Sequence, residues 1–220
     1  MRLKIDLSEF DALVFAGGGG RCIWQAGFTK VLLDSGNLKI NQIAAVSAGA
    51  TIASIVFAGK AEEGLAYFKS ATQRNPKNFY PENLFRNEPV FPQYKIYYQA
   101  IHDLFDSATL QKLKDGPPIK AMITLPPSIL GSYFGTLLGF MLYLVEKKIR
   151  NPIHPTFSKM FGYKSIAPLV NDCNNVKELA DLLIQSSCTP PFVPVKKRNG
   201  IPALDGGIVD NVPADAISGN

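Results

Sequence analysis

Short apolar runs alternate with longer amphipathic segments along the chain. Residues 12–16 form an apolar run that ends in four glycines, and apolar positions over 23–35 follow helical spacing. Residues 43–46 form a second apolar run, and the small residues that follow, up to position 58, predict a buried helix. A strand, a tight turn and a helix thus occur twice before residue 60. This indicates an α/β fold of three layers, α/β/α, with a mainly parallel central sheet covered by helices on both faces.

The rest of the chain continues this pattern less regularly. We expect amphipathic helices at residues 62–72, 93–105 and 176–185, and a shorter helix at 107–113 that opens with capping-type residues. Residues 119–125 predict a third strand, stopped by two prolines, and residues 192–195 predict a further strand. We find no internal repeat and no low-complexity linker, so residues 1–220 are expected to form a single domain.

The most apolar segment contains 18 consecutive uncharged residues, at positions 128–145, and ends in a charged cluster. This length reaches the lower limit for a membrane span. Gly131, Gly135 and Gly139 recur every four residues and suit close packing against a neighbouring helix. A true span would place the two halves of the chain on opposite sides of a bilayer. We therefore interpret 128–148 as a helix that lines a pocket or lies at the membrane interface, with an ordinary buried helix as the alternative.

Composition and charge exclude several classes of protein. The chain of 220 residues is 46% hydrophobic and only 19% charged, which excludes a disordered chain. Its net charge of +5 is spread along the sequence, which indicates weak attraction to anionic surfaces and no nucleic-acid binding. Cys22, Cys173 and Cys188 are odd in number and widely spaced, so they suit reduced thiols rather than a disulfide framework or a zinc site.

The N-terminal residues carry no apolar run of signal-peptide length before their first acidic side chains. We therefore expect a cytoplasmic protein, with peripheral attachment to membranes left open. Secretion by a route without a cleaved signal stays open.

Four glycines at positions 17–20 lie between the first predicted strand and the following helix. Such a turn leaves several backbone N–H groups pointing at one spot, beside a helix N-terminus that begins near Arg21, and so binds an anion. The anion is either a phosphate or the oxyanion of an attacked ester. A dinucleotide fingerprint needs a third glycine at the position of Cys22 and is disfavoured, while a purely structural turn remains an alternative.

Ser47 lies where a predicted strand meets a helix. The pattern Ala45-Val46-Ser47-Ala48-Gly49 differs from the nucleophile elbow G-x-S-x-G only at its first position. Small neighbours are needed there because other backbone packs closely on both sides of the serine. The alternative role of Ser47 is to cap the helix that follows.

A histidine base does not fit the order of the chain. His102 and His154 both precede Asp205, whereas an α/β hydrolase of the common type has its histidine after the acid. A carboxylate close to the serine hydroxyl can itself act as the base. Asp205, followed by Gly206 and Gly207, is the candidate, and a surface turn is the alternative interpretation.

Together these pieces resemble the patatin-like phospholipases, acyl hydrolases with a Ser-Asp dyad. Gly17-Gly18-Gly19-Gly20-Arg21 is similar to the family's oxyanion segment, Val46-Ser47-Ala48-Gly49-Ala50 to its nucleophile elbow, and Asp205-Gly206-Gly207 with Asn211 and Pro213 to its Asp-Gly-Gly box. The segments Gln25-Ala26-Gly27 and 186–192 also resemble family segments, in the same order. The chain departs from the family at Cys22 and Ala45, where glycine is usual.

The resemblance implies that Ser47 attacks the ester carbonyl of a phospholipid or other acyl-ester lipid, that Asp205 takes the proton, and that an acyl-enzyme forms. It assigns the oxyanion hole to Gly18, Gly19 and Gly20. Supporting roles fall to Gly17, Arg21, Gly49, Gly206 and Gly207, and Arg21 either fixes the loop or faces the lipid phosphate. The family needs no metal or organic cofactor. A catalytically weak, lipid-binding module of the same fold is the alternative, and the oligomeric state is open.

Overall fold

The structure, a computed structural model, describes residues 7–36, 38–86, 88, 90–150, 152 and 154–217. The strands of its sheet are β1 (Ala12–Phe15), β2 (Gln42–Val46), β3 (Ile119–Leu125), β4 (Lys164–Ile166), β5 (Lys196–Arg198) and β6 (Ile201–Asp205). The α-helices of the described residues are α1 (Trp24–Asp34), α2 (Ala48–Phe57), α3 (Ala61–Arg74), α4 (Gln93–Leu104), α5 (Ser107–Asp115), α6 (Ser132–Ile149), α7 (Phe157–Met160) and α8 (Val176–Ser186).

The sheet is mixed, with parallel strands at its centre. β1, β2 and β3 pair in parallel, as the two strand-turn-helix units predict. β4 and β6 both pair antiparallel with β3, and β5 pairs antiparallel with β6. The α/β class is therefore as the sequence predicts, and the antiparallel strands come from the second half of the chain.

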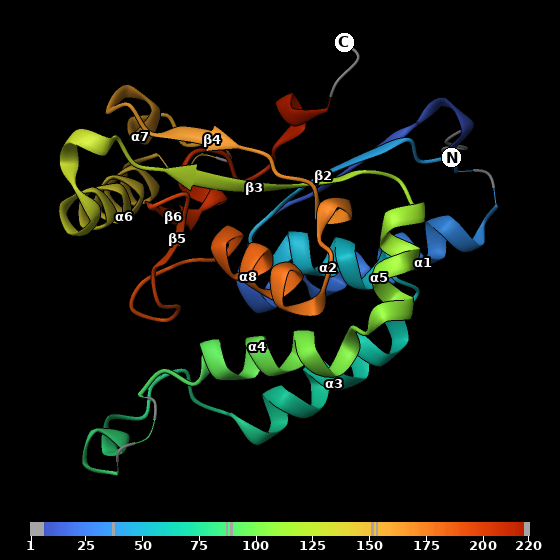
Figure 1. Ribbon diagram of the computed structural model, residues 1–220, viewed down its shortest axis with the longest axis horizontal. Coiled ribbons are helices and arrows are strands. Elements are labelled where there is room, and N and C mark those ends of the chain that lie inside the picture. Colours follow the sequence, from blue (N-terminus) through green and yellow to red (C-terminus); the bar gives the residue numbers. More distant parts are fainter. Residues whose placement is uncertain are drawn as a thin grey trace.

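Strands β2 and β6 lie end to end along one edge of β3. Ile123 and Thr124 pair with both β4 and β6, so these two strands occupy opposite edges of β3. The bridge between Lys120 and Leu169 continues the register of β4, which places β2 on the same edge as β6. Because β2 runs parallel to β3 and β6 runs antiparallel to it, their C-terminal ends meet at Val46 and Asp205 (Figure 1).

The main core lies between the sheet and the helices α1, α2, α5 and α8 (Figure 1). Alternate strand residues point to this side, among them Phe15, Ala45 and Ile123, which are almost fully buried. α2 is buried over most of its length, as its small and apolar residues predict. Helices α3 and α4 lie farther from the sheet and pack against each other (Figure 1).

Helix α6 covers the opposite face of the sheet at the β6 end. Leu204 points away from the main core and joins a second buried cluster with Tyr163, against which Leu142 of α6 packs. Gly135 and Gly139 allow this approach, because a Cβ there would lie 2.9 Å from Pro126 and 2.7 Å from Tyr163. Gly135 and Gly139 thus allow close packing, but against Pro126 and Tyr163 rather than the neighbouring helix that was predicted, and Gly131 precedes α6 with a positive φ of 65°. Among the described residues, no helix, α6 included, combines the length and hydropathy that crossing a bilayer requires.

The strand predicted at residues 192–195 is wrong. These residues form a turn and an irregular stretch, and the strand follows them as β5. Pro194 explains the difference, because proline has no N–H to donate to a neighbouring strand. Phe192 and Val193 instead line the cavity described below.

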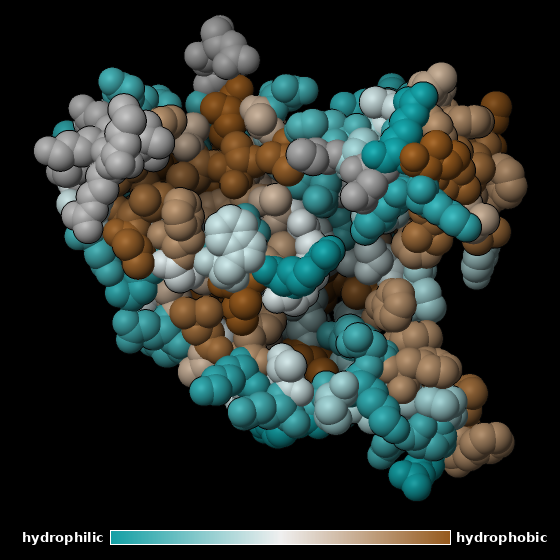
Figure 2. All heavy atoms as spheres, turned by 180° about the vertical axis from the view of Figure 1, so that it is seen from behind, coloured by the Kyte–Doolittle hydropathy of each residue, from teal (hydrophilic) through white to brown (hydrophobic). Residues whose placement is uncertain are grey.

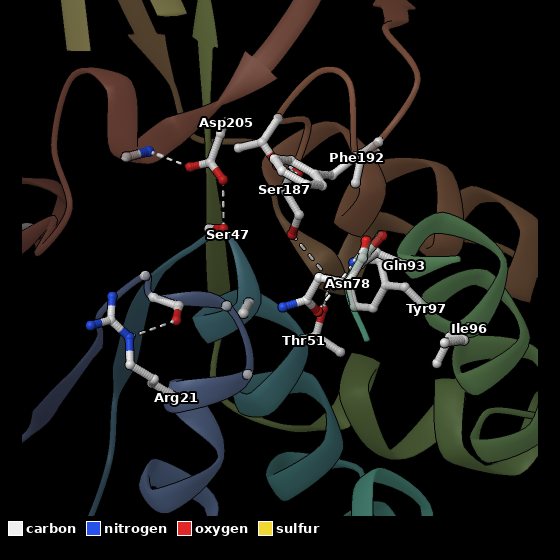
Figure 3. Close-up of a pocket in the computed structure, with 18 of the residues that line it drawn as sticks. Arg21, Ser47, Thr51, Asn78, Gln93, Ile96, Tyr97, Ser187, Phe192 and Asp205 are labelled. Carbon is white, nitrogen blue, oxygen red and sulfur yellow. Dashed lines mark hydrogen bonds between the residues drawn. The ribbon is translucent and has the colours of Figure 1, made fainter. Parts of the chain in front are cut away.

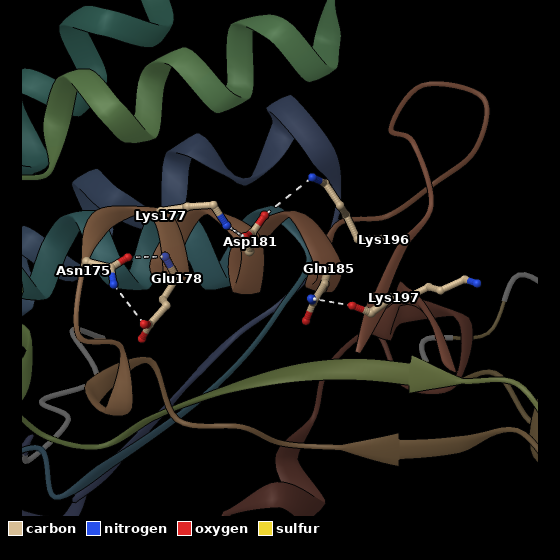
Figure 4. A network of polar contacts seen from close by, with 7 residues as sticks. All are labelled: Asn175, Lys177, Glu178, Asp181, Gln185, Lys196 and Lys197. Carbon is tan, nitrogen blue, oxygen red and sulfur yellow. Dashed lines mark hydrogen bonds and ion pairs between the residues drawn. The ribbon is translucent and has the colours of Figure 1, made fainter. Parts of the chain in front are cut away.

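Polar contacts tie the β5–β6 hairpin to α8 (Figure 4). Asp181 pairs with Lys177 on its own helix, at 2.8 Å, and with Lys196 of β5, at 3.6 Å. Gln185 donates to the backbone oxygen of Lys197. Because β6 ends at Asp205, these contacts hold the strand that carries this carboxylate against the helix layer.

Candidate active site

A cavity of about 850 Å³ opens where the C-terminal ends of β2 and β6 meet. Its polar end contains Ser47, Asp205 and the glycine loop 17–20 with Arg21 (Figure 3). Apolar side chains of α3, α4 and α6 extend it away from this end, including Phe68, Ile96 and Phe140. The sequence-predicted residues of three separate motifs are therefore brought to one site.

Ser47 occupies the sharp turn between β2 and α2. Its φ of 55° and ψ of −133° are strained for a residue with a Cβ, a conformation typical of a nucleophile elbow. Ser47 precedes the first residue of α2, but its hydroxyl makes no capping bond to that helix. Its Oγ donates to Oδ2 of Asp205 over 2.6 Å. The capping alternative is therefore not what the structure shows.

Asp205 is held by two donors on its two oxygens. Oδ2 accepts from Ser47, and Oδ1 accepts from the N–H of Gly207 over 2.7 Å. Burial raises the pKa of Asp205 from 3.8 to about 6, although both hydrogen bonds act to lower it. At neutral pH the carboxylate is still ionised in most molecules, and a base with this pKa accepts a proton more readily than an ordinary aspartate.

The glycine loop 17–20 turns beside this pair. Gly18 and Gly19 have positive φ values of 158° and 60°, and a 3-10 helix begins at Gly19 and leads into α1. The first N–H groups of a helix have no partner inside it, and such a helix start suits an anion, whereas the N–H of Gly17, before this helix, donates to the oxygen of Asn211. Arg21 donates from Nε to the oxygen of Gly18 and also lines the cavity (Figure 3).

Side chains behind the loop fix its path. Gln25 holds Ala16 with two hydrogen bonds, accepting from its N–H at 2.9 Å and donating to its oxygen at 3.0 Å. The thiol of Cys22 donates to the same oxygen. Cys22 is buried, and burial raises its pKa to about 11, so it stays a neutral thiol with a packing role.

Gly49 and Gly206 support the site without lining the cavity. A Cβ on Gly49 would lie 2.5 Å from the oxygen of Ala16, and one on Gly206 would lie 2.5 Å from the oxygen of Met122. Both positions therefore require glycine because backbone packs directly against them. The close packing at Gly49 holds the start of α2 near β1, and the close packing at Gly206 holds the end of β6 near β3.

Ser186 and Asn211 are further parts of the site; both lie in segments that resemble the family, but the resemblance assigned no role to either. The N–H of Ser47 donates to Oγ of Ser186 at 3.0 Å, and that hydroxyl donates to Met122 at 2.7 Å. The backbone oxygen of Asn211 accepts from Gly17, and its side chain donates back to the oxygen of Gly17. The C-terminal segment thus holds the glycine loop, a contact between residues 194 positions apart.

A polar group lies farther inside the cavity. The hydroxyl of Tyr97 is hydrogen-bonded to Thr51 and, at 3.1 Å, to Ser187 (Figure 3). Burial raises the pKa of Tyr97 to about 12, so the phenol stays neutral. These hydroxyls add to the polar part of the cavity lining, and the helical pattern of residues 93–105 gave no sign of the contacts of Tyr97.

The two histidines lie outside the cavity lining. His102 stacks on Tyr98, with ring centroids 4.4 Å apart, and His154 pairs with Asp210 at 2.8 Å. In the part of the chain that the structure describes, no group of three or more His, Cys, Asp or Glu side chains is placed to hold a metal ion.

Comparisons with known proteins bear on the family of the chain. A comparison with curated proteins gives no match. The family model described as patatin-like phospholipase matches residues 13–217, which include the glycine loop, Ser47 and Asp205. The chain belongs to the patatin-like phospholipase family, whose members are hydrolases that act on lipids.

Proposed function

We propose that the protein is a phospholipase A-type esterase that releases fatty acids through an acyl-enzyme. The observation that carries this proposal is the 2.6 Å hydrogen bond from Ser47 Oγ to Asp205 Oδ2 at the polar end of the cavity. A serine whose hydroxyl donates to a buried carboxylate, on a strained turn beside a glycine loop that begins a helix, has the parts that acyl transfer needs.

Asp205 acts as general base and then as general acid. As Ser47 Oγ forms a bond to the ester carbonyl carbon, its proton moves to Oδ2 of Asp205, and the carbonyl oxygen becomes an oxyanion. The oxyanion collapses, the bond to the leaving alcohol breaks, and Asp205 returns the proton to that alcohol. Water then attacks the acyl-enzyme with the same proton transfers and releases the fatty acid.

The N–H groups of Gly18, Gly19 and Gly20 would stabilise the oxyanion. They lie at the start of the 3-10 helix Gly19–Ile23, on the wall of the cavity that contains Ser47. Arg21 donates to the oxygen of Gly18, which favours the role of fixing this loop. Loss of one such donor costs on the order of 100- to 1,000-fold in turnover.

The cavity suits a lipid acyl chain. Its volume of about 850 Å³ is in the upper part of the range for small-molecule sites. Its lining includes the apolar side chains Phe68, Ile96 and Phe192, together with polar side chains away from Ser47 such as Asn78 and Gln93. A substrate that combines a long apolar part with polar groups fits this lining.

Fatty-acid release from phosphatidylcholine, combined with labelling by a fluorophosphonate, tests the proposal. We expect Ser47→Ala to abolish both signals. Asp205→Asn should lower release by about 1,000-fold, since a general base contributes roughly 100- to 10,000-fold. Ser54→Ala is the matched control for the serine, because Ser54 is buried in the same helix and donates only to Ala50. Asp215→Asn, an exposed aspartate of the C-terminal segment, is the control for the carboxylate.

Undiminished release by both site variants would refute the proposal. Binding of phospholipid vesicles by a wild-type protein that neither reacts with the probe nor releases fatty acid would instead support the lipid-binding module. Thermal melting of each variant shows whether a loss of activity reflects the site or the fold.

A further inference from the structure

The outer face of α6 and the turns beside it form an exposed apolar surface. Its apolar residues follow helical spacing and include Tyr133, Phe134, Leu137, Met141 and Leu144. Ile129 before the helix and Met160 after it add to this surface, with 92% and 79% of their area exposed. On the space-filling view, hydrophobic surface gathers on the side of the molecule that α6 forms, at the right of Figure 2, bordered by hydrophilic side chains.

α6 carries large apolar residues on its outward side as well as toward the protein, unlike an ordinary surface helix. The side facing the protein carries Gly135, Gly139, Leu142 and Glu146. Glu146 is almost fully buried and accepts hydrogen bonds from the backbone N–H groups of Thr156 and Phe157. The outward apolar residues are exposed because the protein packs against the opposite side.

A third face of α6 borders the cavity. Phe140, Tyr143 and Lys147 follow each other at helical spacing and line the same cavity as Ser47. Successive residues of a helix are 100° apart around its axis, so this cavity-lining stripe lies next to the exposed apolar residues Tyr133 and Leu144. One helix thus presents an apolar surface outward and forms a wall of the cavity next to it.

Basic side chains lie at the C-terminal end of α6 and in the segment that follows it. Residues 128–164 carry five of them, Lys147, Lys148, Arg150, Lys159 and Lys164, and a single acidic residue, Glu146, which is buried. This segment therefore has a net charge of +4, out of +5 for the whole chain. Basic residues next to an exposed apolar helix face are complementary to a membrane that contains anionic lipid.

We propose that the outer face of α6 docks onto the surface of an anionic membrane. The apolar residues enter the headgroup region, and the basic residues meet lipid phosphates. The cavity then opens next to the bilayer, beside the stripe of Phe140 and Tyr143. The docking itself does not depend on Ser47, while the delivery of lipid to the cavity rests on the proposed function.

Vesicle co-sedimentation tests the proposal, with phosphatidylcholine alone and with an equal mixture of phosphatidylcholine and phosphatidylglycerol. The Ser47→Ala protein is used so that the lipid stays intact. We expect binding to the mixed vesicles and much weaker binding to phosphatidylcholine alone. Leu137→Glu and Met141→Glu should each weaken binding by about 10-fold or more. Lys148→Ala should weaken binding to mixed vesicles by about fivefold.

Val31→Glu is the matched control, because Val31 is an apolar residue of α1 with 70% of its area exposed. It should bind vesicles like the parent. With Ser47 present, Leu137→Glu should hydrolyse a short soluble ester at the wild-type rate, since Leu137 lies outside the cavity lining.

Three results would overturn the docking proposal. One is a parent protein that does not bind mixed vesicles, and another is equal weakening by Val31→Glu and Leu137→Glu. The third is a dimer in analytical ultracentrifugation that Leu137→Glu dissociates while vesicle binding is unchanged, which would make this face a protein interface. Hydrolysis that is lost in the Ser47 and Asp205 variants alone bears on the proposed function. It says nothing against docking, which vesicle binding measures separately.

Discussion

Ser47 and Asp205 lie 158 positions apart in sequence, yet their side chains meet at 2.6 Å. Strand β3 brings them together, because it pairs with β2 through its first half and with β6 through its second half on the same edge. The two residues stand at the C-terminal ends of these strands, which run toward each other. Their contact is thus a property of the sheet and does not depend on a mobile loop.

The raised pKa of Asp205 predicts the acid limb of the pH–rate profile. The base must be ionised to accept the proton of Ser47, and its pKa of about 6 means that ionisation is lost below that value. We expect kcat/KM for a short soluble ester to fall about tenfold per pH unit below pH 6 and to level off above it. An acid limb centred near pH 4 would show that burial does not raise the pKa of the Asp205 carboxyl in the working enzyme.

The same shift predicts that Asp205 lowers stability at neutral pH. Its pKa is about 6 in the folded state and 3.8 ordinarily, so between these values the folded protein binds more protons than the unfolded chain. The free energy of unfolding therefore falls as pH rises from 4 to 6, and the destabilisation caused by ionised Asp205 has its full size above pH 6. Asp205→Asn removes this destabilisation and should raise the free energy of unfolding by up to about 3 kcal/mol at pH 8.

Urea unfolding of wild type and Asp205→Asn at pH 4 and pH 8 checks this expectation. The difference between the two proteins should be present at pH 8 and should shrink at pH 4, where the carboxyl of the wild type is largely protonated in the folded state. A variant that is less stable than wild type at pH 8 would contradict it. Asp215→Asn, which changes an exposed aspartate, should show no such dependence on pH.

The residues that the structure brings together in the candidate site could be picked out from the sequence, because each lies in a short motif with a local physical meaning. Four glycines before a helix, small residues around Ser47 and two glycines after Asp205 are visible without any knowledge of tertiary contacts. Their order along the chain resembled one family, which the family model confirms.

Other features depend on contacts between distant segments, which local patterns do not reveal. Ser186 contacts Ser47, which lies 139 positions earlier in the chain. The hydrophobic periodicity of α8, which ends at Ser186, indicates that Ser186 is buried but does not indicate this contact. The pairing of β6 and β2 with one edge of β3 also follows from tertiary structure alone. Likewise, the apolar composition of 128–148 predicted a helix that lines a pocket or lies at a membrane interface, with a buried helix as the alternative, and only the tertiary structure shows which of its residues are exposed.

Gly49→Ala should disrupt the nucleophile elbow. The added Cβ would lie 2.5 Å from the oxygen of Ala16 and 2.7 Å from that of Phe15, and neither backbone atom can move without shifting β1. We expect a loss of about 1–3 kcal/mol in stability and a fall in turnover at temperatures where the variant is still folded.

Gly27→Ala, in α1, is the control, since nothing lies within 4 Å of its Cβ position. It should be neutral or stabilising by up to about 1 kcal/mol. Equal behaviour of the two variants in melting and ester hydrolysis would show that backbone contact at Gly49 is unimportant.

Ser186 is expected to be a positioning residue for the nucleophile. Its hydroxyl accepts from the N–H of Ser47 and donates to Met122, and all three residues are buried. Ser186→Ala leaves both backbone groups without this partner, which should cost about 1–3 kcal/mol of stability. Because the strained turn at Ser47 loses one of its restraints, kcat should fall by about tenfold while KM stays nearly unchanged.

Ser186→Thr keeps the hydroxyl and should restore most of the turnover. Ser54→Ala removes a buried hydroxyl that bonds only within α2, so it should lower stability without lowering kcat. A Ser186→Ala protein that melts earlier but turns over at the wild-type rate would assign Ser186 a role in folding alone.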